Sequence, residues 1–102
     1  MGVVFRSRLR EDAGEDYPRI AERMERLVSA MPGFISFKTF TAADGERLAL
    51  GEFESEEAAA AWREHPEHRE AQRRGRADFY ESFRLQILTP LRDTGFQRRE
   101  EG

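Results

Sequence analysis

Alternation of hydrophobic and polar residues marks four stretches of the chain, and each of them predicts a β-strand. In the first stretch the odd-numbered residues share one face, while Val4 and three arginines share the other. Side chains of a strand point alternately to opposite faces, so this period of two indicates a half-buried strand. The predicted strands are Val3–Arg10, Phe34–Thr41, Arg47–Glu54 and Tyr80–Thr89.

Between the first two strands, apolar residues recur every three or four positions. They are Tyr17, Ile20, Ala21, Met24, Leu27, Val28 and Met31. This spacing is typical of an amphipathic helix with one apolar stripe. Asp16 is predicted as the N-cap of the helix, and Pro18 lies in the first turn, where its missing N–H is not needed. The pair Pro32-Gly33 is expected to end it.

A sequence motif typical of a β-hairpin turn lies between the second and third predicted strands. Asp44 and Gly45 form an Asp-Gly pair, which readily adopts the positive φ angles of a tight turn. We therefore expect these two strands to pair antiparallel.

A second helical region follows the third strand. Ser55 is predicted to cap a helix that continues to Trp62, with two glutamates in its first turn, where the helix dipole favours acids. Pro66 is expected to interrupt this helix, and His68–Gly75 predict a second short helix before the last strand.

The resulting order, βαββαβ, predicts the α+β class and a ferredoxin-like fold, with a four-stranded antiparallel sheet and helices on one face. Apolar residues lie on both faces of the strands, and Val4, Ile35 and Phe37 cannot all face the helices. A second copy of the same sheet is the simplest cover for the other face, which predicts a homodimer.

The length of 102 residues fits one domain, which we place at residues 1–90. Pro90 stops the last strand, and residues 91–102 form a polar C-terminal tail that is expected to be flexible. Phe96 of this tail could dock elsewhere.

Composition narrows the possible functions. Hydrophobic residues make up 38% of the chain and charged residues 36%, a balance that suits a domain sharing apolar surface with a partner subunit. The absence of cysteine excludes disulfides, thiolate chemistry and iron–sulfur sites. No run approaches the roughly 18 apolar residues of a membrane span, and no signal peptide is evident, so a soluble, cytoplasmic protein is expected.

Charge gives no general reason to expect a nucleic-acid partner, because the net charge is −3. The arginines between residues 69 and 76 are interleaved with acids, which indicates a solvated, salt-bridged surface. On the predicted outer sheet face, Arg6 and Arg8 are expected to pair with Glu52 or Glu54, or with acids across the dimer; the alternative is that they bind an acidic ligand.

Several segments together resemble the antibiotic biosynthesis monooxygenase (ABM) family of dimeric α+β-barrel proteins. The likeness spans Val3 to Pro90, and the phrase around Trp62 is its most distinctive part. The segments that carry it are VVFRSRLR, MPGFISFKTF, LGEFESEEAAAAW, WREHPEHREAQ and FYESFRLQIL.

The resemblance implies a pocket between the sheet and the helices of each subunit. Some members of the family oxidise phenols, anthrones or quinols with O₂ and without metal or flavin, and this sequence has no Gly-rich dinucleotide loop. On this basis we expect no cofactor and a small aromatic substrate. The predicted catalytic residues are His65, His68 and Tyr80, and the predicted substrate-binding residues are Phe5, Ser7, Trp62, Gln72 and Phe79.

In these expected roles Trp62 supplies an aromatic wall, and His65 or His68 accepts a proton near neutral pH. Tyr80 or Gln72 donates hydrogen bonds to an oxyanion. The alternative for Trp62 is packing in the core, and the alternative for Tyr80 is anchoring the edge of the sheet. The histidines could equally serve to cap a helix or make a structural hydrogen bond.

Two metal-dependent alternatives are disfavoured. A haem-degrading branch of the family uses an asparagine, a tryptophan and a histidine at the positions of Ser7, Trp62 and Gln72, and glutamine cannot replace an imidazole as an iron ligand. His65 and His68 could form half of a metal site, but no third ligand has suitable spacing.

Two functional hypotheses follow. The first is a cofactor-independent monooxygenase of a small aromatic metabolite such as a quinol, phenol or anthrone. The second is a non-catalytic dimeric module that binds a small apolar ligand.

Overall fold

A computed structural model of the chain describes residues 1–99. Its elements follow the predicted βαββαβ order, with a short π-helical turn, η1, before the last strand. They are β1 (Gly2–Leu9), α1 (Asp16–Ser29), β2 (Phe34–Thr41), β3 (Arg47–Phe53), α2 (Glu56–Glu64), α3 (Pro66–Arg74), η1 (Gly75–Phe79) and β4 (Tyr80–Leu88).

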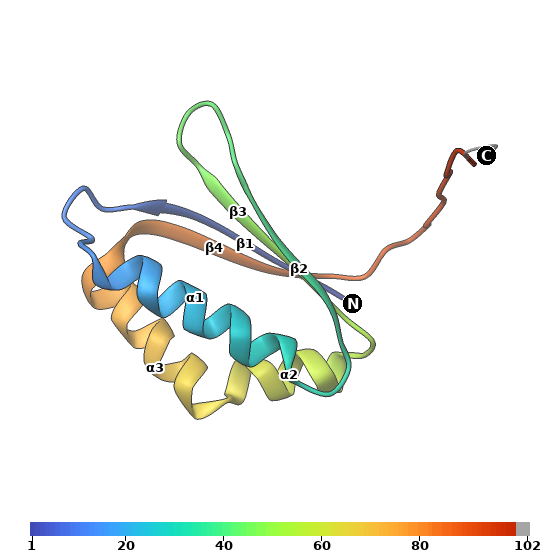
Figure 1. Cartoon of the computed structure of the whole chain (residues 1–102), viewed down its shortest axis with the longest axis horizontal. Coiled ribbons are helices and arrows are strands. Elements are labelled where there is room, and N and C mark those ends of the chain that lie inside the picture. The colour runs from blue at the N-terminus through green and yellow to red at the C-terminus, as the bar shows by residue number, and fades with distance from the viewer. Residues whose placement is uncertain (100–102) are drawn as a thin grey trace.

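The four strands form one antiparallel sheet in the order β2-β3-β1-β4, and the helices lie together on one side of it (Figure 1). This is the predicted α+β ferredoxin-like fold. The tip of the hairpin between β2 and β3 points away from the helices (Figure 1). Within residues 1–99, no helix is both long enough and apolar enough to cross a membrane.

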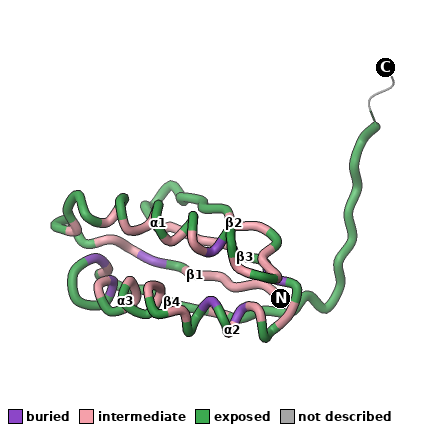
Figure 2. Tube along the Cα trace, turned by 60° about the horizontal axis from the view of Figure 1, so that its bottom comes forward, coloured by how far each residue is buried: buried purple, intermediate pink, exposed green. Residues whose placement is uncertain are grey.

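The hydrophobic core lies where the end of α1 and the start of α2 meet the sheet. Val28 and Ala59 from the helices pack with Phe53 of β3 and with Trp62 of α2. Figure 2 shows that the buried positions lie on the sides of the elements that face one another. Trp62 is only 9% exposed, so the interpretation of this residue as part of the core is confirmed.

The N-cap predictions were right for one helix and wrong for the other. The Ser55 side chain accepts a hydrogen bond from the Ala58 N–H at 3.1 Å, as expected of an N-cap. Glu15, not Asp16, occupies the N-cap position of α1. Asp16 instead lies in the first turn, where its carboxylate complements the positive end of the helix dipole.

The second short helix begins two residues earlier than predicted. Pro66 does not separate two helices by an irregular segment; it is the first residue of α3. A proline is tolerated there because the first N–H groups of a helix have no intrahelical partner. His65 is therefore the single residue between α2 and α3.

The arginines on the outer sheet face pair with different acids from those predicted. Arg6 contacts Glu46 at 2.9 Å and Arg8 contacts Asp44 at 2.8 Å, both near the β2–β3 turn. The pairing of β1 with β3 explains this, because it places Glu52 opposite Gly2, at the far end of the strand. The expected pairs with Glu52 or Glu54 were wrong.

Residues 89–99 follow β4 as an extended segment that leads away from the body of the protein (Figure 1). Leu91 and Phe96 in this segment are exposed, and the Arg98 guanidinium lies 5.8 Å from the Phe96 ring centre. Flexibility of the tail stays a prediction, and its last residues, 100–102, lie outside the described residues.

Candidate functional site

Strand pairing aligns four side chains in one row across the sheet. Ser7 of β1 lies opposite Arg47 of β3 and opposite Phe83 of β4, and Arg47 lies opposite Thr41 of β2. Residues directly opposite each other project from the same face of a sheet. Phe53 lies six residues after Arg47 in the same strand and packs under the helices, so the row projects from the helix-covered face.

Aromatic rings gather around this row, and we call them the end cluster: Phe5, Tyr17, Phe79, Tyr80 and Phe83. The Phe5 ring lies 5.3 Å from that of Tyr80 and 5.4 Å from that of Phe83. Tyr17 of α1 meets Phe79 at 5.5 Å and Tyr80 at 5.9 Å, in edge-to-face contacts. Such contacts are favoured by the charge distribution of aromatic rings. The cluster thus joins the first helix to the start of the last strand.

Tyr80 carries a perturbed hydroxyl group. Burial raises the pKa of Tyr80 well above its usual value, and the neighbouring Tyr17 adds to this increase. Burial has this effect because a low-dielectric environment disfavours the charged phenolate. Tyr80 therefore stays protonated over the physiological pH range and can act as a hydrogen-bond donor, not as a base.

Ser7 is a buried polar residue, only 5% exposed, in the middle of the sheet. Its hydroxyl can donate one hydrogen bond and accept others. Between the charged Arg47 and the ring of Phe83, it adds a second neutral donor to the site.

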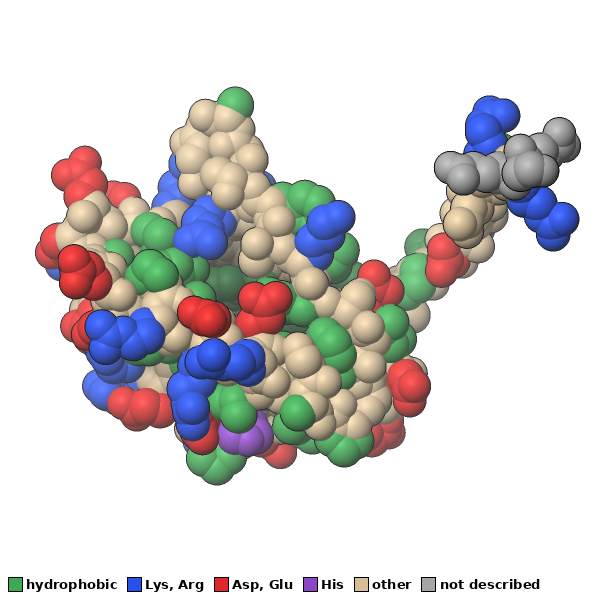
Figure 3. Space-filling view, in the orientation of Figure 1, with side chains coloured by type: hydrophobic (Ala, Val, Ile, Leu, Met, Phe, Trp, Pro, Cys, Tyr) green, Lys and Arg blue, Asp and Glu red, His purple; other side chains and the backbone are tan. Residues whose placement is uncertain are grey.

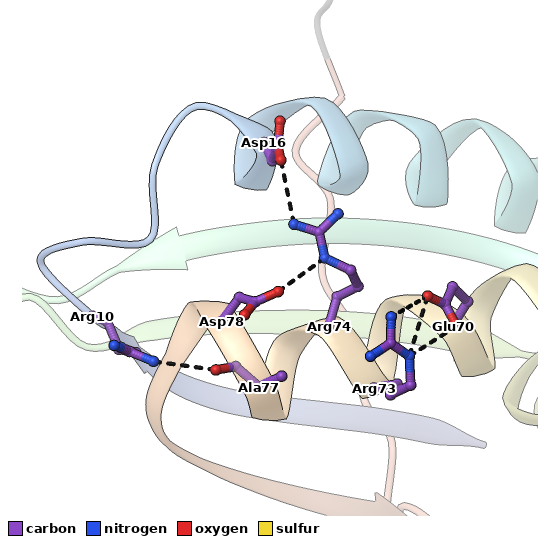
Figure 4. Close-up of polar contacts among 7 residues, drawn as sticks. All are labelled: Arg10, Asp16, Glu70, Arg73, Arg74, Ala77 and Asp78. Carbon is purple, nitrogen blue, oxygen red and sulfur yellow. Dashed lines mark hydrogen bonds and ion pairs between the residues drawn. The ribbon is translucent and has the colours of Figure 1, made fainter.

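A set of arginine contacts fixes the position of the end cluster (Figure 4). Arg74 of α3 reaches Asp16 of α1 at 3.3 Å and Asp78 of η1 at 3.1 Å. Arg10 of the β1–α1 loop donates from its side chain to the Ala77 carbonyl at 3.2 Å. These contacts tie η1, and with it the start of β4, to the first helix and to the loop that follows the first strand.

The predicted pair of Trp62 and His68 is brought together. Their rings stack at 4.3 Å with an angle of 12° between the planes. His68 Nδ1 lies 3.1 Å from the Trp62 carbonyl, which only accepts, so Nδ1 carries the proton and Nε2 is the basic nitrogen. Burial lowers the pKa of His68, so its imidazole is neutral near neutral pH.

His65 has a structural role at the start of α3. Its Nδ1 accepts a hydrogen bond from the Glu67 N–H at 3.2 Å and so caps the helix. Its ring is tilted against Trp62 at 5.7 Å. Gln72, the remaining predicted residue of this region, lies partly buried on α3.

Two open surface depressions lie near the row and the end cluster. One, of about 690 Å³, is lined by Arg10, Glu11, Asp12, Tyr80 and Glu81. The other, of about 270 Å³, is lined by Arg6, Ser7, Glu46, Ser82, Phe83 and Arg84. Tyr80 and Ser7 thus each border a depression, whereas Trp62 and the two histidines border neither of these two.

The structure adds three residues that sequence reasoning did not assign to the site: Tyr17, Arg47 and Phe83. Tyr17 was assigned to the apolar stripe of the first helix, and Phe83 lies in the predicted last strand. A signal for Arg47 was present in the sequence, because it alternates with Ala49, Gly51 and Phe53. A charged residue on the apolar face of a strand is a candidate for a specific role.

Lowering the pH should reduce the stability of the protein, because His68 is buried. Since burial lowers its pKa in the folded state, the unfolded chain takes up a proton more readily, and stability falls as pH drops below about 6.5. In urea titrations between about pH 7.5 and about pH 5, His68→Gln should lose less unfolding free energy than the wild type. An equal loss in both proteins would show that His68 is not shielded from solvent.

Comparison with known proteins supports a family assignment. The sequence model of the family described as antibiotic biosynthesis monooxygenase matches residues 1–74. The chain belongs to this family. It is also 33% identical over 95 residues to the protein YqjZ of Bacillus subtilis, an overlap of 93% of this chain and 82% of YqjZ.

Solved structures share the fold of this ABM-family chain. Rv0793 from Mycobacterium tuberculosis aligns with a TM-score of 0.80 and 21% identity, over 92% of this chain and 97% of Rv0793. SnoaB, described as a cofactor-independent oxygenase from Streptomyces nogalater, aligns with a TM-score of 0.76 and 14% identity. That alignment covers 90% of this chain and 93% of SnoaB. At these identities the likeness establishes the fold.

Proposed function

We propose that this ABM-family chain is a cofactor-independent monooxygenase of a small aromatic molecule, with its site on the helix-covered face of the sheet. The observation that carries the proposal is the end cluster. It combines aromatic rings with the hydroxyl group of Tyr80, and Ser7, which lies opposite Phe83 in the sheet, adds a second hydroxyl group; both are neutral donors at physiological pH. The fold shared with SnoaB supports the same reaction class.

The proposed reaction begins with removal of a proton from an activated ring carbon. His68 Nε2 is the proposed acceptor, because Nδ1 is bonded to the Trp62 carbonyl and the ring is neutral. The carbanion delocalises its charge onto a ring oxygen, which Tyr80 and Ser7 stabilise by hydrogen bonds. Phe5 and Phe79 are the proposed apolar contacts of the ring, and Gln72 completes the proposed wall. Trp62 packs in the core and supports the His68 ring by stacking against it.

Dioxygen is the oxidant in this scheme. The carbanion transfers electrons to O₂, a C–O bond forms, and the returned proton gives a hydroperoxide. Loss of the second proton from the same carbon then breaks the O–O bond and leaves a carbonyl. The O–O bond releases hydroxide, which takes up that proton to give water. A ring CH₂, present in an anthrone and in the keto tautomer of a phenol or quinol, and O₂ thus become C=O and H₂O, with one oxygen atom in each product.

Oxygen uptake tests this function directly. With an anthrone or a 1,4-dihydroxynaphthalene as substrate, the wild type should consume O₂ faster than a protein-free control that corrects for autoxidation. Tyr80→Phe removes one hydroxyl group and should lower turnover by about a hundredfold. His68→Gln should lower it by about a hundredfold as well, and His65→Asn, which retains a capping side chain, should not.

If uptake by the wild type equals the protein-free rate for every quinol, phenol and anthrone, the oxygenase proposal is wrong. The alternative function is then a dimeric module that binds a small apolar ligand. One observation favours this alternative: Nδ1 of both histidines is engaged with the backbone, and Trp62 is packed in the core.

We also propose a homodimer formed by the outer faces of two sheets. By strand pairing, Phe40 and Leu88 lie on this face with Val4, Leu48 and Leu50, and Phe40 and Leu88 are 47% and 48% exposed. Apolar surface of this kind is stabilised by burial against a second copy.

The dimer should bury more than about 1,200 Å² in total and give a dimer mass by light scattering at micromolar concentration. Phe40→Arg should shift the protein to the monomer, because it replaces an exposed apolar side chain of the proposed interface by a charge. Thr89→Arg, which adds the same charge beyond the end of β4, serves as the control. A monodisperse wild-type monomer would contradict the proposal.

A further inference from the structure

Arg47 differs from the other arginines of the sheet and helices in its surroundings. Ion pairs join many of the arginines to carboxylates: Arg6, Arg8, Arg10, Arg23, Arg26, Arg73 and Arg74. Most of these pairs lie on the surface, where basic and acidic side chains are interleaved (Figure 3). Arg47 is partly buried, and among residues 1–99 the structure gives it no carboxylate partner.

The charge of Arg47 lies within the proposed site. Its guanidinium carbon is 5.2 Å from the centre of the Tyr17 ring, and its backbone pairs with that of Ser7. Its charge also reaches Tyr80, whose pKa it lowers against the larger increase caused by burial. The site therefore holds the Arg47 guanidinium, three hydroxyl groups from Ser7, Tyr17 and Tyr80, and the rings of the end cluster. Two other arginines lie over rings of this cluster: Arg74 is 4.9 Å from the Phe79 ring centre and is paired with Asp16 and Asp78, and Arg76 is 5.6 Å from the Phe83 ring centre and is exposed.

We infer that Arg47 binds the carboxylate of an aromatic acid, so that the ligand of this site is a ring that carries an anionic substituent. The inference rests on the proposed function for the location of the site and goes beyond it in naming the ligand class. A guanidinium presents two parallel N–H groups to a carboxylate, and a partly buried cation without a counter-ion is costly. The rings of Phe5 and Phe83 would contact the aromatic part.

The competing explanation is that Arg47 only packs against Tyr17 through a cation–π contact. A purely structural contact of this kind predicts no preference between charged and neutral ligands. The two explanations therefore differ in a measurable way.

Isothermal titration with 2-naphthoate and 2-naphthamide separates them, because the two probes have nearly the same shape and differ in charge. The wild type should bind 2-naphthoate at least about tenfold more tightly than the amide. Arg47→Gln should abolish this preference and leave affinity for 2-naphthamide within about twofold of the wild type. Arg47→Lys should keep part of the preference, because lysine retains the positive charge but lacks the two parallel N–H groups of a guanidinium.

Arg69→Gln is the matched control, because it removes the same charge from an exposed position on α3. It should retain the full preference for 2-naphthoate. The inference is overturned if the wild type binds both probes equally or binds neither, if Arg47→Gln keeps the preference, or if Arg69→Gln loses it.

Failure of this inference and failure of the oxygenase proposal give different results. A preference for 2-naphthoate that depends on Arg47, without oxygen uptake on any substrate, supports the ligand class and rejects the oxygenase. Oxygen uptake above the control, with equal turnover by Arg47→Gln and no preference between the probes, supports the oxygenase and rejects the role of Arg47.

Discussion

Replacing Trp62 by alanine is expected to destabilise the protein by about 3–5 kcal/mol, the usual cost of removing a large buried aromatic side chain. Trp62 is 9% exposed and packs with Val28, Phe53 and Ala59 in the main core. It also stacks on His68, which would lose its aromatic neighbour. Urea unfolding monitored by circular dichroism measures the difference in free energy.

Such a loss is a large share of the total stability of a small domain, which is about 5–15 kcal/mol. Trp62→Phe keeps a ring and should cost clearly less than the alanine variant. Leu91→Ala, at a fully exposed position, should change stability by less than about 0.5 kcal/mol. A cost below about 1 kcal/mol for Trp62→Ala would mean that the indole lines an open pocket and not the core.

Trp62→Phe also tests the function of this residue. If Trp62 forms part of the wall of the proposed site, the phenylalanine variant should mainly weaken ligand binding, because it keeps a ring and loses the indole N–H. Measuring stability and binding on the same variant separates packing from recognition.

Gly33→Ala is expected to cost about 2–4 kcal/mol, the second large effect. Gly33 lies in the turn between α1 and β2 with a φ angle of 81°, in the left-handed region that side chains disfavour. A Cβ atom added there would lie 2.6 Å from the Cβ of Ala58 in α2. The substitution therefore combines backbone strain with a clash between the turn and the helix.

Gly45→Ala is the matched control for Gly33→Ala. Its φ angle of 91° imposes similar backbone strain, but no heavy atom within the described residues lies within 4 Å of an added Cβ. It should cost only about 1–2 kcal/mol. Thermal unfolding measures the loss of stability in both variants, and the difference between the two losses gives the cost of the clash. Equal costs would show that the turn moves away from α2 without penalty.

Element types were well predicted from the sequence, because the strands and the first helix each have a regular apolar period. The ends of elements were predicted less well. Local preference favours Asp16 over Glu15 as the N-cap, but the helix begins one residue earlier, and Glu15 occupies that position without a capping hydrogen bond from its side chain. The interruption predicted at Pro66 is confirmed, since α2 ends at Glu64, but the sequence did not indicate that Pro66 also starts α3.

The candidate site was predicted only in part. The resemblance named Phe5, Ser7 and Tyr80, which the structure brings to the same end of the sheet. It could not indicate that Arg47 lies beside Ser7, because these residues are 40 positions apart and meet only through the pairing of β1 with β3. A shift of one residue in that pairing would move Arg47 to the other face.

The sequence by itself determined the βαββαβ order and the ferredoxin-like fold, because both follow from local periodicity and from turn and cap residues. The tertiary structure alone decided which side chains meet: Tyr17 with Tyr80, Trp62 with His68, and Arg47 with the end cluster. It also decided the pKa shifts of His68 and Tyr80, whose first cause is burial. Burial depends on every element that packs around a residue, and no local pattern contains that information.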